Sequence, residues 1–198
     1  MDKKETIKKI FTNFSLDHVY HDVVIEKYFH SAYKQLEKQF GCVYLSYIIE
    51  SQLLGEKLQL STSKEWNSFY YEHGLSETCH IAKICRKMHI QMRSYTINWN
   101  LIAPDDTKSR KTHTLRREFG FDNGATYATI LKNNHFGSYF ELINIVGNSL
   151  DLNFYKELQQ SKVTVASILR FLRVKGYNSL SNRLNIITKY LQAPVKPC

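Results

Sequence analysis

Apolar side chains in this sequence recur with two different periods, and the period changes several times along the chain. Helical spacing occurs in residues 20–40, where Val24, Tyr28 and Leu36 lie among Lys, Glu and Gln. Alternation of apolar and polar residues, typical of a half-buried strand, is clearest in residues 94–102. The sequence therefore predicts a mixed fold in which helices pack on a sheet.

The order of these segments predicts the fold class. Helices are predicted over 20–40, 64–74, 77–89 and 113–120, with further helices along 165–191 that break at Gly176. Strands are predicted over 41–50, 56–63, 94–102, 124–132 and 139–146. A loop is predicted over 103–112. Most strands are expected to join as antiparallel neighbours, with helices covering both faces of the sheet. We predict an α/β fold, an α-β-α sandwich with a five-stranded antiparallel sheet.

Composition limits the class of protein. The chain has 198 residues, of which 43% are apolar and 23% charged, as in a globular domain. No apolar run is long enough to cross a membrane, and the first residues lack the apolar core of a signal peptide. The four cysteines Cys42, Cys79, Cys85 and Cys198 form no CxxC pair. A reduced, cytoplasmic protein without membrane contact is expected.

Basic residues outnumber acidic ones by 27 to 18, which gives a net charge of +9. Residues 151–198 contain eight Lys or Arg against two acids, and residues 107–117 contain five basic residues and no acid. Such stretches suit a phosphate backbone, or they are simply solvated helix faces. Charge alone leaves both interpretations open.

Familiar catalytic and metal-binding motifs are missing. GxGxxG, GxxxxGK[ST], HExxH and GxSxG do not occur in a fitting context. Cys79, His80, Cys85 and His89 have metal-ligand chemistry, but on one helix only the last two share a face, and two ligands are too few for structural zinc. An adjacent Cys–His nucleophile pair lacks an orienting third group. We expect no enzyme, no metal and no cofactor.

Aromatic side chains form the most informative group. Trp66 and Tyr70 are four residues apart and share a helix face, and Trp99 is expected on a strand. Trp and Tyr combine apolar area with a hydrogen-bond donor, which suits a pocket for an apolar molecule bearing a carbonyl. The alternative is that all three are ordinary core residues.

The ordered set of these residues resembles the signal-binding domain of LuxR-type quorum-sensing transcription regulators over residues 20–172. The family pattern has a W-x3-Y helix, an Asp-Pro pair, a strand tryptophan and a helix ending FGL-x-x-G. Trp66, Tyr70, Trp99 and Gly124 fall on four of these six hallmark positions, whereas Cys79 and His80 occupy the Asp-Pro positions.

The resemblance implies a PAS/GAF-like sensor domain with a pocket for an N-acyl homoserine lactone between sheet and helices. In the family, the tryptophan matching Trp66 donates to the lactone carbonyl, and the residues matching Tyr70 and Trp99 wall the ligand. The family aspartate accepts from the ligand amide, which the thiol of Cys79 does poorly. Gly124 matches a glycine with no room for a side chain.

We therefore expect a ligand-sensing domain over residues 1–172 and a C-terminal helix and linker over 173–198, without a helix-turn-helix domain. The expected ligand is a small apolar signal molecule with a carbonyl, different from the usual lactone. A homodimer is an expected partner arrangement, and DNA contact is expected only through a domain absent from this chain. The alternatives are a sensor-only protein that dimerises with other regulators and a basic nucleic-acid-binding module.

Overall fold

The computed structural model describes residues 22–52, 55–88, 92–133 and 137–192. The elements in chain order are α2 (Val23–Phe40), β1 (Cys42–Ser51), β2 (Lys57–Ser61), α3 (Lys64–Glu72), α4 (Leu75–Thr78), α5 (His80–Met88), β3 (Ser94–Asn98), the 3₁₀ turn η1 (Trp99–Leu101), α6 (Thr107–Glu118), β4 (Gly124–Asn133), β5 (Gly137–Gly147), α7 (Phe154–Gln160) and α8 (Lys162–Gln192). In the described part of the chain, no helix combines the length and apolar character needed to cross a membrane.

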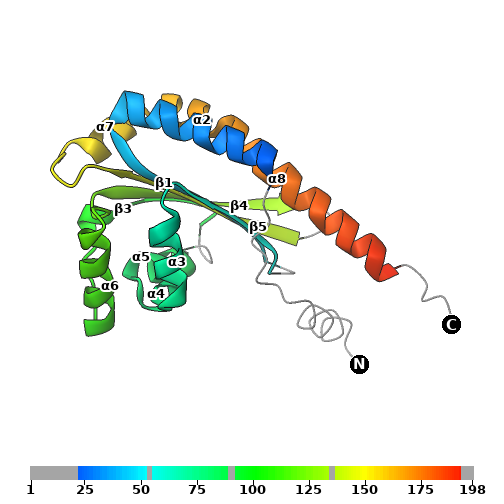
Figure 1. Cartoon of the computed structure of the whole chain (residues 1–198), viewed down its shortest axis with the longest axis horizontal. Helices are drawn as coiled ribbons and strands as arrows, with labels where there is room; N and C mark the ends of the chain where they lie inside the picture. Colours follow the sequence, from blue (N-terminus) through cyan, green and yellow to red (C-terminus); the bar gives the residue numbers. More distant parts are fainter. Residues whose placement is uncertain (1–21, 53–54, 89–91, 134–136, 193–198) are drawn as a thin grey trace.

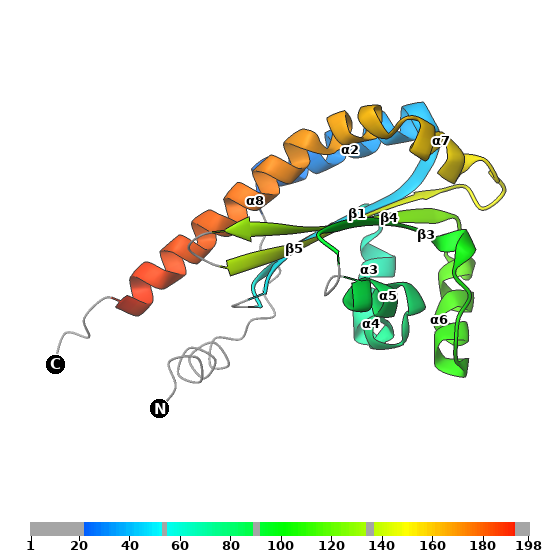
Figure 2. The same ribbon diagram turned by 180° about the vertical axis from the view of Figure 1, so that it is seen from behind.

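The five strands form one sheet in the order β2-β1-β5-β4-β3, and every neighbouring pair is antiparallel. The predicted five-stranded antiparallel sheet is therefore confirmed. Helices cover both faces, with α2, α7 and α8 on one side and α3, α4, α5 and α6 on the other (Figures 1 and 2). The predicted sandwich of helix, sheet and helix layers is confirmed as well.

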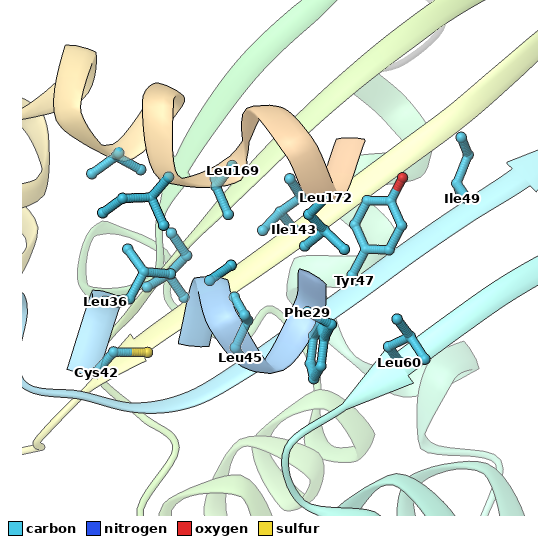
Figure 3. Packing of buried hydrophobic residues seen from close by; sticks show 14 of the residues in the cluster. Phe29, Leu36, Cys42, Leu45, Tyr47, Ile49, Leu60, Ile143, Leu169 and Leu172 are labelled. Carbon is cyan, nitrogen blue, oxygen red and sulfur yellow. The ribbon is translucent and has the colours of Figure 1, made fainter. Parts of the chain in front are cut away.

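Alternation along the strands gives each face of the sheet its own cluster of buried side chains. On β1, Tyr47 and Ile49 face α2 and α8, whereas Tyr44 belongs to the cluster under α3–α6. Figure 3 shows Leu172 of α8 beside Tyr47 and Ile143 in the first cluster. The first cluster is the main hydrophobic core. A binding site is therefore to be sought on the opposite face of the sheet.

Local sequence signals set both ends of α2, the helix that precedes the first strand of the sheet. The Asp22 side chain accepts from the backbone N–H of Val24 at 2.9 Å, which caps the helix N-terminus. Gly41 ends the helix in the left-handed conformation, with φ 65°, before β1 begins at Cys42. These signals are local, and the predicted helix and strand here agree with the structure.

The predicted loop over 103–112 is wrong for its second half, because α6 already begins at Thr107. Asp106 and Ser109 form a reciprocal capping box: the Ser109 N–H donates to Asp106 Oδ1 at 2.7 Å, and the Asp106 N–H donates to Ser109 Oγ at 3.1 Å. This arrangement starts the helix at Thr107, six residues before the predicted start at residue 113. The early start brings the basic stretch 107–117 onto a helix.

The predicted helix break at Gly176 is also wrong, because α8 runs through it. A Cβ atom at Gly176 would lie 2.2 Å from the Tyr47 hydroxyl oxygen, so the glycine permits close packing of helix on sheet. Leu172 and Leu180, on either side of the glycine, pack in the same core. The expected boundary between residues 172 and 173 thus falls inside one helix that is buried on both sides of it.

Two ion pairs tie α8 to the buried sheet. Arg173 Nη2 lies 2.6 Å from Oε2 of Glu141, a carboxylate that is almost fully buried. Arg183 Nε lies 2.7 Å from Oε2 of Glu56, which is also buried. Breaking either pair would leave a buried carboxylate without an opposite charge. Part of the basic excess in residues 151–198 therefore has a structural role.

Candidate ligand-binding site

A cavity of about 640 Å³ lies on the α3–α6 face of the sheet. Four of the predicted site residues line this one cavity: Trp66, Tyr70, Cys79 and Trp99. Its remaining wall includes the apolar side chains Ile48, Ile81, Ala82, Phe140 and Leu142. A mainly apolar cavity of this size with a few polar groups is typical of a small-molecule site.

Trp66 and Tyr70 reach the cavity from α3, whose first turn is capped by Ser63. The Ser63 hydroxyl accepts from the Trp66 backbone N–H at 3.1 Å. The Trp66 and Tyr70 rings lie 5.5 Å apart, as the spacing of four predicts, and Trp66 also packs on Phe119 at 4.9 Å. Among the described residues, no hydrogen bond engages the Trp66 indole N–H.

Trp99 does not lie on a strand, as the alternating pattern predicted, but begins the 3₁₀ turn η1 directly after β3. The turn forms because the Asn98 side chain accepts from the Asn100 backbone N–H at 3.0 Å. In this turn the Trp99 ring lies against Gly124 at the start of β4.

A chain of side-chain hydrogen bonds on the sheet holds the Trp99 ring. The Trp99 indole N–H donates to Thr126 Oγ1 at 2.7 Å, the Thr126 hydroxyl donates to Asn144 Oδ1 at 2.7 Å, and Asn144 Nδ2 donates to Ser46 Oγ at 2.8 Å. Asn144 is the register partner of both Thr126 and Ser46 on the neighbouring strands. Sequence reasoning missed these three polar residues, which only strand pairing brings together.

Gly124 supports the cavity without lining it. A Cβ atom at this position would lie 2.7 Å from Trp99 Cε3 and about as close to two further ring atoms. Real Cβ contacts are not this short, so any side chain here would displace the indole. The glycine therefore fixes the place of Trp99.

Cys79 separates two short helices where one helix over 77–89 was predicted. Its backbone is extended, with φ −63° and ψ 117°, between α4 and α5. Burial raises the pKa of the Tyr70 phenol well above its usual value, and the neighbouring Cys79 sulfur, to which the phenol hydrogen-bonds, raises it further. Tyr70 and Cys79 are thus neighbours in the cavity wall.

The other residues of the predicted Cys/His group do not gather around Cys79. His80 is buried against His113, with ring centroids 5.5 Å apart, and Cys85 lines the cavity. His89 lies outside the described residues. Within the described ranges, no three His, Cys, Asp or Glu side chains are placed to hold a metal ion.

Arg116 is a buried charged residue of the site that sequence reasoning missed. Its side chain belongs to the basic stretch 107–117, yet it is only 4% exposed and lines the cavity. Its guanidinium lies over the Trp99 ring, 4.6 Å from the centroid. Ser109, Thr112 and Arg116 share the buried face of α6, a pattern that becomes visible only once the helix begins at Thr107.

The arrangement has the fold of the autoinducer-binding domain of LuxR-type transcription regulators, with an aromatic cavity between its sheet and one helical layer. One solved structure with this fold is CepR2 from Burkholderia cenocepacia, an N-acylhomoserine lactone dependent LuxR family transcription factor. Its TM-score is 0.51 at 14% identity, and the match covers 78% of this chain and 96% of that one. The fold expected from the resemblance is confirmed.

Two further structures match less well. SdiA of Escherichia coli has a TM-score of 0.47 at 12% identity, covering 87% of this chain and 69% of that chain. SdiA in complex with octanoyl-rac-glycerol has a TM-score of 0.44 at 11% identity, with the same coverage. No protein-family model and no curated protein matches the sequence.

Proposed function

We propose that this chain is the small-molecule sensor domain of a LuxR-type regulator and acts by binding, without catalysis. The observation that carries the proposal is the cavity of about 640 Å³ in which Trp66, Tyr70 and Trp99 meet. The fold it shares with CepR2 supports the proposal, since that protein depends on an N-acylhomoserine lactone. Cavities of a few hundred Å³ enclose most of the surface of a small ligand.

The two tryptophans have different roles in this proposal. Trp99 already uses its indole N–H on Thr126, so the ring serves as a wall against the apolar part of the ligand. Trp66 keeps its indole N–H for an acceptor on the ligand, such as a carbonyl oxygen. Tyr70 packs beside Trp66 and completes the aromatic side of the site.

The ligand we propose is different from the usual acyl homoserine lactone. Such a ligand would bury an amide N–H near Cys79, and a thiol is a weak acceptor. An amide donor without a good partner costs about 1–3 kcal/mol, or roughly ten- to a hundred-fold in affinity. We therefore expect acyl homoserine lactones to bind weakly, and nanomolar binding of one of them in calorimetry would contradict this part of the proposal.

The cysteines support a binding role in a reducing, cytoplasmic compartment. Cys42, Cys79 and Cys85 are buried free thiols. Burial raises the pKa of Cys85, which lines the cavity, to about 12, so that its nucleophilic thiolate form is disfavoured at neutral pH. A catalytic thiol would need the opposite shift.

The test of the proposal is Trp66→Phe, which keeps an aromatic ring but removes the indole donor. Small molecules are extracted from the purified proteins and compared by mass spectrometry. We expect the wild-type chain to carry a ligand and Trp66→Phe to lose it, with a melting temperature close to that of wild type. A large loss of stability instead would identify Trp66 as a core residue only.

Tyr139→Phe is the matched control for this experiment. It also removes one aromatic donor, the hydroxyl that lies 3.1 Å from Ser181 Oγ, but on the α8 side of the sheet. Ligand content should be unchanged in this variant. Equal ligand loss in both variants would show that the effect is general and would contradict a donor role of Trp66.

The outer surface of α8 supports a homodimer as the oligomeric state. Val163, Phe171 and Val174 are exposed there, at 77%, 62% and 50%. Exposed apolar side chains along one element are typical of an interaction surface. We propose a second copy of this chain as the partner, and light scattering coupled to size-exclusion chromatography would reveal a monomer if this is wrong.

A further inference from the structure

Arg116 places a permanent positive charge inside the cavity wall. The side chain projects from α6, is 96% shielded from solvent and contacts the cavity. A guanidinium does not lose its proton under physiological conditions, so burial cannot neutralise it. Buried charges in proteins are normally paired with an opposite charge, because desolvating them is costly.

Within the described residues, the guanidinium has no such partner. No carboxylate oxygen comes within 4.0 Å of it, and Asp122, whose charge acts on it from further away, pairs instead with Arg117 at 3.4 Å. Among the described ranges the one hydrogen bond of the Arg116 guanidinium is from Nη2 to His113 Nδ1 at 2.9 Å. Nε is buried without any hydrogen-bond partner. The contact with the Trp99 ring compensates part of the charge but satisfies none of these donors.

Neighbouring groups do not supply the missing negative charge. Burial and then the charge of Arg116 lower the pKa of both His80 and His113, so both imidazoles stay neutral near pH 7. Glu50, the acidic residue among the described lining residues, faces Lys57 as its cross-strand partner. The wall of the cavity that Trp66 also lines therefore contains a buried cation, Arg116, that no carboxylate of the described residues pairs with.

We propose, building on the sensor function above, that the ligand is an apolar carboxylic acid whose carboxylate pairs with Arg116. Its hydrocarbon part would lie against Trp66, Trp99 and the aliphatic side chains Ile81 and Leu142. A carboxylate accepts several hydrogen bonds at once and matches the donor geometry of a guanidinium. The ligand then supplies the counter-charge that the protein lacks.

Matched pairs of acid and neutral ester test this inference. Decanoic and dodecanoic acid are titrated against their methyl esters, with binding followed by tryptophan fluorescence. Both tryptophans of the chain line the cavity, so the signal reports occupancy directly. For wild type we expect the acid to bind at least about thirty-fold more tightly than its ester, as for other buried charge pairs.

Variants at position 116 assign the preference to the guanidinium. Arg116→Met keeps the length and apolar stem but removes the charge, and should abolish the preference for the acid. Arg116→Lys keeps the charge and should retain part of it. Arg117→Met is the control, because Arg117 is the exposed neighbour on α6 and should leave the preference unchanged. Without ligand, Arg116→Met should melt no lower than wild type, because it removes an uncompensated buried charge.

The outcomes separate this inference from the proposed function. Esters that bind as tightly as the acids, or an acid preference that survives in Arg116→Met, would overturn the inference and leave the sensor function standing. A neutral molecule co-purifying with wild type would do the same. If neither acids nor esters bind and no molecule is extracted, the proposed function fails and the inference fails with it.

Discussion

Trp66 and Trp99 line the same cavity, but only Trp99 has its indole N–H engaged within the described protein, by Thr126 Oγ1 at 2.7 Å. This difference follows from their positions. Trp99 lies against the sheet, where polar side chains on β4 and β5 can reach it. Trp66 lies on the helical side of the cavity, packed among aromatic rings that accept no conventional hydrogen bond. One ring is therefore fixed, while the other keeps a donor for a ligand.

Thr126→Val tests whether the hydrogen-bond chain fixes Trp99. The substitution keeps the shape but leaves the Trp99 indole N–H and Asn144 Oδ1 without their partner. We expect a loss of about 1–3 kcal/mol in the free energy of unfolding, measured by urea denaturation. The control is Thr96→Val on β3, which is exposed and should change stability little. Equal stability of both variants would show that the hydrogen-bond chain contributes nothing.

Gly124→Ala tests the close approach of β4 to the Trp99 ring. The new methyl group would lie 2.7 Å from Cε3, so we expect the ring to move, the tryptophan fluorescence to change and stability to fall by about 1–3 kcal/mol. The same substitution in a Trp99→Leu background should cost clearly less, because the clash is then gone. If the two costs are equal, the destabilisation has another origin.

Gly176→Ala tests the packing of α8 on β1. Alanine is the better helix former by about 1 kcal/mol, but its methyl group would overlap the fully buried Tyr47 hydroxyl at 2.2 Å. Overpacking costs about 1–3 kcal/mol, and at this distance we expect it to exceed the helix gain and lower the melting temperature. Asn178→Ala, at an exposed position of the same helix, should raise it slightly. A higher melting temperature for Gly176→Ala would contradict this packing.

Because His80 is buried, we expect acid to lower the free energy of unfolding. Burial lowers its pKa to about 4 in the folded state, while the unfolded value stays near 6.5. Between these values the unfolded chain binds a proton that the folded chain does not, so stability falls as the pH decreases from about 6.5 to about 4. The loss attributable to this histidine is at most about 3 kcal/mol.

The measurement compares urea denaturation of wild type and His80→Phe across this pH range. The phenyl ring retains the contact with His113 but cannot bind a proton, so the variant should lose less stability on acidification. His30→Gln, at an exposed position of α2, should keep the wild-type pH dependence. Parallel curves for wild type and His80→Phe would exclude His80 as the source.

Local signals determined much of this fold. The helix over 20–40 was predicted from its helical apolar face and from Gly41 at its end, and the following strand was predicted from its β-branched and aromatic residues. The strands predicted over 124–132 and 139–146, on either side of a turn-like segment, agree with β4 and β5. The spacing of Trp66 and Tyr70 predicted their shared face, since both lie on one helix.

Contacts between distant segments decided the rest. Glycine is a poor helix former, and Gly176 therefore predicted a helix break. In the structure α8 continues through Gly176, where Tyr47, far away in the sequence, packs directly against the glycine. Arg116 belongs to a basic stretch that suggests solvent exposure, but the position of α6 against the sheet turns it onto Trp99 and into the cavity. Sequence by itself determined most of the helices and strands, because those preferences act over a few residues, but it did not determine where α6 begins or that α8 continues past Gly176. Tertiary structure decided which polar and charged side chains face the cavity, because burial depends on what packs against them.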